Sequence, residues 1–155
     1  VDEKKDLEPL LKARDKFIYV VKNYPNTDFA LDAKFKLDLI KEILASKEMY
    51  LGSYYIQKKK WIAAINRYKN VINEYEATIY VEEALHRLVE LHYKIGLENE
   101  AKKYAQLLGY NYLSSDWYKN TYKIFNSDYI LAKPKVRKKE SSYLIKKYNS
   151  IFKRK

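Results

Sequence analysis

The sequence predicts an all-α protein built from repeated helical hairpins, and three observations lead to this fold class. The 155 residues include only three Gly and three Pro, too few for the closely spaced turns of an all-β domain. Hydrophobic residues make up 47% of the chain and charged residues 33%, a balance typical of a folded, soluble domain. Apolar residues recur at spacings of three and four, which places them on one face of a helix.

One apolar pattern occurs three times, and each copy predicts a helix that ends at a tyrosine. The spacings within a copy are four, three and four residues, and the short turn that follows contains a Thr or Ser able to cap the next helix. The copies are Ala13, Phe17, Val20 and Tyr24; then Ala64, Tyr68, Val71 and Tyr75; then Ala101, Ala105, Leu108 and Tyr112. The capping residues of the three turns are Thr27, Thr78 and Ser115. Such self-similarity predicts a repeat architecture.

Helix start and stop signals divide the chain into six expected helices. They cover about residues 6–24, 28–59, 61–75, 79–95, 98–110 and 115–126. The second is unusually long, because no Pro interrupts it and apolar residues continue at helical spacing. It is one long helix or two nearly collinear ones. Gly96 and Gly109 are expected to end the fourth and fifth helices.

The middle copy carries the most specific motif. Its residues are Leu51, Gly52 and Tyr55, followed by Trp61, Ala64 and Tyr68. A Gly inside a helix costs about 1 kcal/mol relative to Ala, so we expect Gly52 to allow the close approach of a neighbouring helix. These residue types at these offsets resemble the tetratricopeptide repeat, a helical hairpin of about 34 residues. The first copy lies 51 residues before the second, and the third lies 37 after it, so the long helix adds about half a repeat.

Charge divides the chain into two expected domains. The net charge is +11, and residues 128–155 hold ten Lys and Arg against only two acidic residues. We therefore expect a helical-repeat domain over 1–127, with two and a half to three repeats, and a basic tail over 128–155. The tail reads as a linker followed by an amphipathic helix with Leu144, Tyr148, Ile151 and Phe152 on one side. It could lie on anionic lipid or on a partner protein, or it could be a solvated segment.

No motif in the sequence predicts catalysis, a cofactor or a metal site. There is no Cys, and no stretch reaches the roughly 18 apolar residues of a membrane span. His86 and His92 are six residues apart, which points them in different directions on one helix, so we expect packing or surface roles. The acidic residues are scattered among lysines as on solvated helix faces. Five of the seventeen tyrosines fall on repeat core positions rather than on a base-stacking surface, namely Tyr24, Tyr55, Tyr68, Tyr75 and Tyr112.

A narrower resemblance covers about residues 1–126. The blocks that carry it are Tyr24-Pro25-Asn26-Thr27, Ser53-Tyr54-Tyr55, Lys60-Trp61, Asn66-Arg67, Leu108-Gly109-Tyr110-Asn111-Tyr112 and Asp116-Trp117-Tyr118. They are similar to the C-terminal repeats of the BamD (ComL) family of outer-membrane assembly lipoproteins, in its α-proteobacterial branch. One departure is Lys59, which stands where that family usually has Gly before the Trp helix.

The resemblance implies a non-catalytic scaffold of the β-barrel assembly machine, on the periplasmic face of the outer membrane, with a lipid anchor upstream of this chain. Its partners would be the POTRA domains of BamA and the other lipoproteins of the machine. Arg67 matches the family's contact arginine, and its guanidinium suits a bidentate carboxylate pair. Tyr54 and Lys58 match positions at the same interface, and Asn66 beside Arg67 completes the predicted set.

Two other functions fit the residues without the resemblance. One is a tetratricopeptide-type adaptor, cytosolic or periplasmic, that binds a peptide in its concave groove. The other is a helical repeat that binds nucleic acid through the basic tail and exposed tyrosines.

Overall fold

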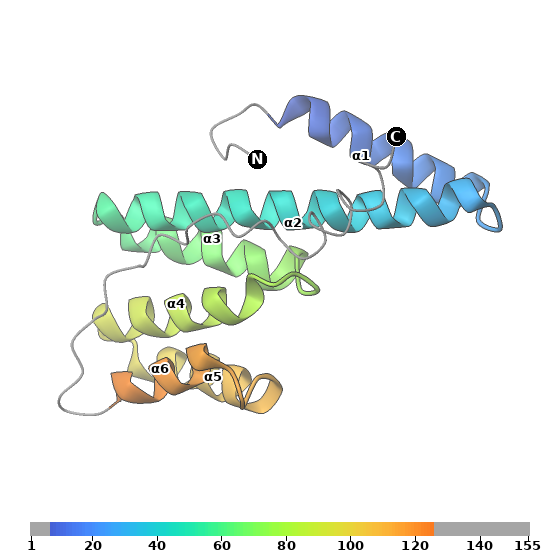
Figure 1. Cartoon of the computed structure of the whole chain (residues 1–155). Coiled ribbons are helices and arrows are strands. Elements are labelled where there is room, and N and C mark those ends of the chain that lie inside the picture. The colour runs from blue at the N-terminus through green and yellow to red at the C-terminus, as the bar shows by residue number, and fades with distance from the viewer. Residues whose placement is uncertain (1–6, 126–155) are drawn as a thin grey trace, which may run out of the picture. The chain divides into compact units, whose positions relative to one another are not determined.

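The computed structural model describes residues 7–125, and all regular secondary structure in that range is helical (Figure 1). The six helices are α1 (Glu8–Asn23), α2 (Asp28–Gln57), α3 (Trp61–Glu74), α4 (Val81–Lys94), α5 (Glu98–Asn111) and α6 (Asp116–Ile124). The predicted all-α fold of tetratricopeptide-type hairpins is therefore confirmed, and α2 is a single helix of 30 residues. The basic tail predicted over 128–155 lies outside the described residues.

Contacts group the described residues into two compact units, 7–40 and 41–125, and α2 contributes to both. In the larger unit, α4 packs against α3, α5 and α6. Its main core is shared by the second half of α2 with α3 and α4. The buried residues of this core are Ala45, Met49, Ala64, Ile65, Tyr68, Val71, Ala84, Leu88 and Leu91. The apolar stripe of the middle copy is thus a core stripe, as its spacing predicts.

Gly52 allows the close helix contact that the sequence predicts. A Cβ atom built on Gly52 would lie 2.6 Å from Cζ of Tyr68, well inside any real contact distance. The Tyr68 ring of α3, which is fully buried, lies directly against the backbone of α2 at this point. Gly109 plays the same part against Tyr118, at 2.7 Å from Cε2. The prediction that Gly109 ends its helix is therefore wrong, because α5 continues to Asn111.

The first copy of the pattern is packed differently from the other two. Helix α1 has no buried residue, and Ala13 and Phe17 are only half-buried. Tyr24 is 54% exposed, so its predicted core position is wrong. Within residues 7–40 the other helical segment is the start of α2. There Lys36 places its Nζ 5.4 Å from the centre of the Phe17 ring.

In the turns after the three tyrosines, the backbone N–H of the third residue on donates to the tyrosine carbonyl, at 3.0 to 3.3 Å. The hydroxyl groups of Thr27 and Thr78 donate to the carbonyls of Tyr24 and Tyr75, each at 2.8 Å. Two of the predicted N-caps are confirmed: the Thr27 Oγ1 accepts from the Ala30 N–H, and the Ser115 Oγ from the Tyr118 N–H, both at 3.2 Å.

The predicted cap at Thr78 is wrong, because α4 begins three residues later, at Val81, without a side-chain cap. The backbone N–H of Ile79 donates instead to a carboxylate oxygen of Glu42 on α2, at 3.3 Å. Glu42, 37 residues away in the chain, thus binds the backbone of a turn that a cap at Thr78 would have made the first turn of α4.

Helices α2 and α4 end in the same backbone motif. After α2, the N–H of Lys60 donates to the Tyr55 carbonyl and the N–H of Lys59 to the Ile56 carbonyl, both at 2.9 Å. After α4, Leu97 and Gly96 make the corresponding bonds. These are Schellman ends, in which one residue adopts the left-handed conformation. That residue is Gly96 (φ 82°), as predicted, in one case and Lys59 (φ 57°) in the other.

Candidate partner-binding site

Arg67 lies at the edge of the buried stripe of α3. Ala64, Tyr68 and Val71 point into the core, and at 100° per residue Arg67 falls beside them rather than opposite. Its side chain is 36% exposed and turns toward α2. The helix therefore holds the stem of the arginine against the hairpin while the guanidinium reaches solvent.

A carboxylate of α2 meets this guanidinium. The Nη1 of Arg67 lies 3.4 and 3.5 Å from the two carboxylate oxygens of Glu48, whose side chain is 17% exposed. Asn70, one turn further along α3, donates its Nδ2 to the same carboxylate at 3.2 Å. Glu48 is thus held in place, whereas Arg67 uses one of its three nitrogens. Among the described residues, no acceptor faces its Nε or Nη2.

Aromatic rings link Arg67 to the end of α2. The guanidinium carbon lies 6.0 Å from the centre of the Tyr55 ring, within range of a cation–π contact. Tyr54 meets Tyr55 edge to face, with 5.7 Å between ring centres, and is itself 43% exposed. Lys58 then places its Nζ 5.7 Å from the Tyr54 ring centre. One continuous surface results, and we call Arg67, Tyr55, Tyr54 and Lys58 the docking surface.

Three of the four residues predicted as partner-binding are brought together in this surface. Asn66 is exposed on α3, and among the described residues it makes no side-chain hydrogen bond. Glu48 and Asn70 were not predicted. The contact between Gly52 and Tyr68 fixes how α2 and α3 are aligned. Because the two helices are antiparallel, residues before Gly52 on α2 lie beside residues after Tyr68 on α3. Glu48 is therefore expected near Asn70, and this alignment could have revealed both.

A second arginine–carboxylate group lies inside the larger unit. Nη1 of Arg87 on α4 donates to Glu90 at 2.7 Å, and Nη2 lies 3.4 Å from Glu83. The guanidinium also lies over the Trp117 ring of α6, 5.5 Å from its centre. The side chains of Arg87 and Glu90 are 4% and 7% exposed. The expectation that these carboxylates belong to a solvated helix face is therefore wrong.

The two histidines take packing roles within this interior, as expected. His86 is hydrogen-bonded through Nδ1 to the Thr121 hydroxyl of α6 at 2.7 Å, and its Nε2 lies 3.5 Å from Glu90. His92 lies 5.1 Å from Tyr104, between ring centres. Both are buried. Residues 7–125 contain no group of three or more His, Cys, Asp or Glu side chains placed to hold a metal ion.

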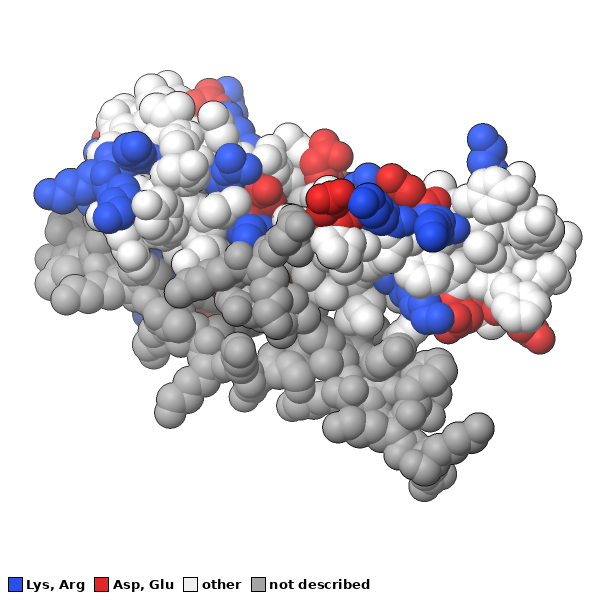
Figure 2. Space-filling model, turned by 90° about the horizontal axis from the view of Figure 1, so that it is seen from above, with Lys and Arg blue, Asp and Glu red and all other residues white. Residues whose placement is uncertain are grey.

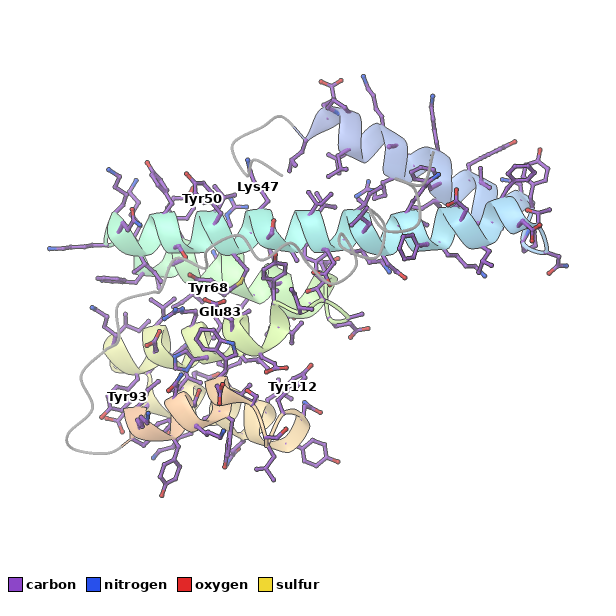
Figure 3. The ribbon with its side chains drawn as sticks, viewed as in Figure 1. Lys47, Tyr50, Tyr68, Glu83, Tyr93 and Tyr112 are labelled. Carbon is purple, nitrogen blue, oxygen red and sulfur yellow. The ribbon has the colours of Figure 1, made fainter. Side chains whose placement is uncertain are left out.

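Burial and neighbouring groups shift the pKa values of Tyr68 and Glu90 in this interior. Burial raises the pKa of Tyr68 to about 12, against a smaller lowering by its hydrogen bond with Ser53. Figure 3 shows Tyr68 and Glu83 close together where α3 faces α4. Burial also acts to raise the pKa of Glu90, but the hydrogen bond with His86 and the charge of Arg87 outweigh it, and the net pKa is lowered. Glu90 is therefore held as a carboxylate.

No helix in the described range combines the length and the apolar character that crossing a bilayer requires.

Comparison with known proteins agrees with the resemblance seen in the sequence. The outer membrane lipoprotein family YfiO matches residues 1–107. The chain is 46% identical over 112 residues to the outer membrane protein assembly factor BamD of Rickettsia prowazekii, covering 72% of this chain and 45% of that protein. It is 43% identical over 109 residues to BamD of Caulobacter vibrioides, covering 70% of this chain and 36% of that protein. The chain thus spans less than half the length of these relatives. It belongs to the BamD family of outer membrane lipoproteins.

Proposed function

We propose that this chain is a non-catalytic scaffold of the β-barrel assembly machine and that it docks on a POTRA domain of BamA through the docking surface. It acts at the periplasmic face of the outer membrane, beside the other lipoproteins of the machine. The relatives are named as assembly factors, which supports the role in assembly. The observation that carries the site is the open edge of Arg67, which Glu48 and Tyr55 contact on a helix whose neighbouring face is buried in the core.

The chemistry of docking follows from that edge. Because Nη1 of Arg67 is engaged by Glu48, the adjacent Nε and Nη2 remain for a carboxylate of the partner, side-on and bidentate. The planar guanidinium is already held over Tyr55, so less side-chain freedom is lost on binding than for a free arginine. Tyr54 offers a rigid amphipathic ring of the kind enriched at the centre of interfaces.

Reversing the charge of Arg67 tests this proposal. Arg67→Glu should weaken binding of the full chain to a purified POTRA fragment by about 30-fold or more, corresponding to about 2 kcal/mol, because a partner carboxylate would meet a like charge. Lys102→Glu, at an exposed position on α5, makes the same kind of charge change away from the surface and serves as the control. Calorimetric affinity for Arg67→Glu equal to that of the control would refute the site.

The other three predicted residues should matter less. Tyr54→Ala should weaken binding by about tenfold, since truncating an aromatic contact removes about 1 kcal/mol or more. Lys58→Ala and Asn66→Ala should each change the affinity by a few-fold at most, because exposed rim residues contribute little. An Asn66→Ala effect larger than that of Tyr54→Ala would move the centre of the interface to the opposite flank of α3.

A further inference from the structure

A cluster of lysines occupies the corner where α2 ends, α3 begins and α4 ends (Figure 1). Lys58, Lys59 and Lys60 follow α2 directly, and all three are exposed. Lys94 in the last turn of α4 is also exposed, and its Nζ lies 4.4 Å from the centre of the Trp61 ring. We call these four lysines the basic corner. In Figure 2, Lys and Arg side chains gather at the end of this unit where α2 finishes.

Within the described range, none of the four corner lysines is paired with a carboxylate, unlike several lysines elsewhere in that range. Lys12, Lys103 and Lys119 each pair with a carboxylate one turn away, at 2.6, 2.6 and 3.0 Å. The four corner lysines form no ion pair with any other residue in the range 7–125. Lys94 complements the negative end of the α4 dipole, but Lys59 and Lys60 lie beyond the last turn of α2. The charges of Lys59 and Lys60 are therefore directed to solvent, whereas Lys58 and Lys94 also contact the Tyr54 and Trp61 rings.

Lys59 is kept at this corner against a backbone preference. Its φ of 57° is in the left-handed region, where an L side chain is disfavoured and Gly is not. The matching turn after α4 has Gly96 at the same position of the motif. A residue in a disfavoured conformation at a surface turn points to a role for its side chain.

The basic corner is continuous with the docking surface. Lys58 belongs to both, through its contact with the Tyr54 ring, and Tyr54 leads through Tyr55 to Arg67. A partner that covers Arg67 therefore extends toward the lysines, and the groups facing them would be anionic by charge complementarity. An acidic protein surface fits this continuity better than a lipid surface, because the Arg67 end calls for a single placed carboxylate.

We propose that the basic corner steers an acidic surface of the partner protein onto the docking surface. This inference rests on the proposed function and deepens it by naming the character of the partner. Exposed, unpaired charges act mainly on the rate of encounter, and their effect falls with ionic strength. A placed, desolvated contact such as that of Arg67 acts mainly on the rate of dissociation. The two parts of one surface thus control different rate constants.

The test is a kinetic comparison of two triple variants of the full chain. K59Q/K60Q/K94Q removes three corner charges and leaves Lys58, which belongs to the docking surface. K12Q/K103Q/K119Q removes three lysine charges elsewhere and is the matched control. Binding to a POTRA fragment by surface plasmon resonance at low and physiological salt should show a three- to tenfold lower association rate for the corner variant at low salt. Its salt dependence should flatten, with the dissociation rate within twofold of wild type.

The outcomes separate this inference from the proposed function. If both triple variants lower the association rate equally, only net charge matters and the basic corner is overturned, even where Arg67→Glu abolishes binding. If Arg67→Glu has no effect, the docking assignment fails by itself. A third arm uses vesicles of phosphatidylglycerol. Flotation of the wild-type chain but not of the corner variant, with unchanged association to the POTRA fragment, would overturn the inference in favour of a membrane surface.

Discussion

Two arginines, twenty residues apart, are built from the same parts and end in different roles. Arg67 and Arg87 each have a carboxylate partner and a nearby aromatic ring. The distance from the guanidinium carbon to the ring centre is 6.0 Å for Arg67 and 5.5 Å for Arg87. The carboxylate distance is 3.4 Å for Arg67 and 2.7 Å for Arg87. The exposed fractions of their side chains are 36% and 4%. Burial and the closeness of the carboxylate, rather than the residue types, distinguish the two arginines.

The difference teaches which arginine can serve a partner. Inside the larger unit, Arg87 uses two of its nitrogens, on Glu90 and Glu83, and joins α4 to α6 through Trp117. A buried charge of this kind cannot exchange its partner without a large cost. Arg67 is held on one side only, in a setting where an ion pair contributes about 1 kcal/mol or less. It can therefore take a second carboxylate while keeping Glu48.

The largest effect should come from removing the buried arginine. Arg87→Ala should lower the free energy of unfolding by about 3–5 kcal/mol, since Glu90 stays buried but loses the guanidinium that lies 2.7 Å from it. Arg67→Ala should lower it by about 1 kcal/mol or less. Urea denaturation of both variants, followed by circular dichroism, measures the difference. Similar losses for the two variants would mean that the buried and exposed groups are energetically equivalent.

Neutralising Glu90 should give the next largest loss of stability, and the size of this loss should depend on pH. Glu90→Gln should lose about 1.5–3 kcal/mol at neutral pH, the value of a hydrogen bond to a charged group. The pKa of Glu90 is lowered in the folded state, so its stabilisation is complete above the unfolded-state pKa and is lost as the pH falls through the folded-state value. The gap in stability between wild type and variant should therefore narrow below about pH 5. A difference in stability between wild type and variant that widens in acid would mean that the pKa of Glu90 is raised, not lowered, in the folded state.

The helices could be predicted from the sequence because their ends carry local signals. Gly96 ends α4 in the left-handed conformation, and Ser115 caps α6 with its own hydroxyl. The misplaced start of α4 has a long-range cause, since Glu42 on another helix binds the Ile79 N–H. The predicted end of α5 at Gly109 is wrong because a Gly that ends a helix and a Gly that makes room for a neighbouring ring cannot be told apart in the sequence.

The two arginines show the same limit for function. Arg67 was identified through a family resemblance, but its partners Glu48 and Asn70 lie on separate helices and follow only from the hairpin register. Arg87, Glu90 and Glu83 are spaced three and four apart on one helix, as in a solvated face. Their burial depends on the packing of α3 and α6 against α4, and local spacing carries no information about that packing.

The core beneath the docking surface should show an intermediate effect. Gly52→Ala should destabilise the chain by about 1–3 kcal/mol, because the added Cβ would overlap the buried Tyr68 ring and α2 would have to move away from α3. Pairing it with Tyr68→Leu, which shortens the ring side chain, should recover part of the loss. The coupling between the two changes in a thermal-melt cycle checks this. Strict additivity would show that the ring can move aside without cost.

The smallest effect concerns the turn that joins the docking surface to the basic corner. Lys59→Gly should stabilise the chain by about 0.5–1 kcal/mol, because Gly adopts the left-handed conformation without a steric penalty. The loss of chain entropy on folding, which is larger for Gly, offsets part of the gain. Gly96→Lys should cost about 1 kcal/mol at the matching turn after α4, by the same argument with the sign reversed.

The two turns should also separate in their effect on binding. Lys59→Gly removes a charge from the basic corner, so the chain should become more stable while its association with an acidic partner slows. Gly96→Lys should lower stability without slowing association, since it removes no charge. Parallel melts and association rates for both variants test this. If Lys59→Gly lowers both the stability and the association rate, the lysine supports the turn itself. Its left-handed conformation would then serve the fold rather than binding.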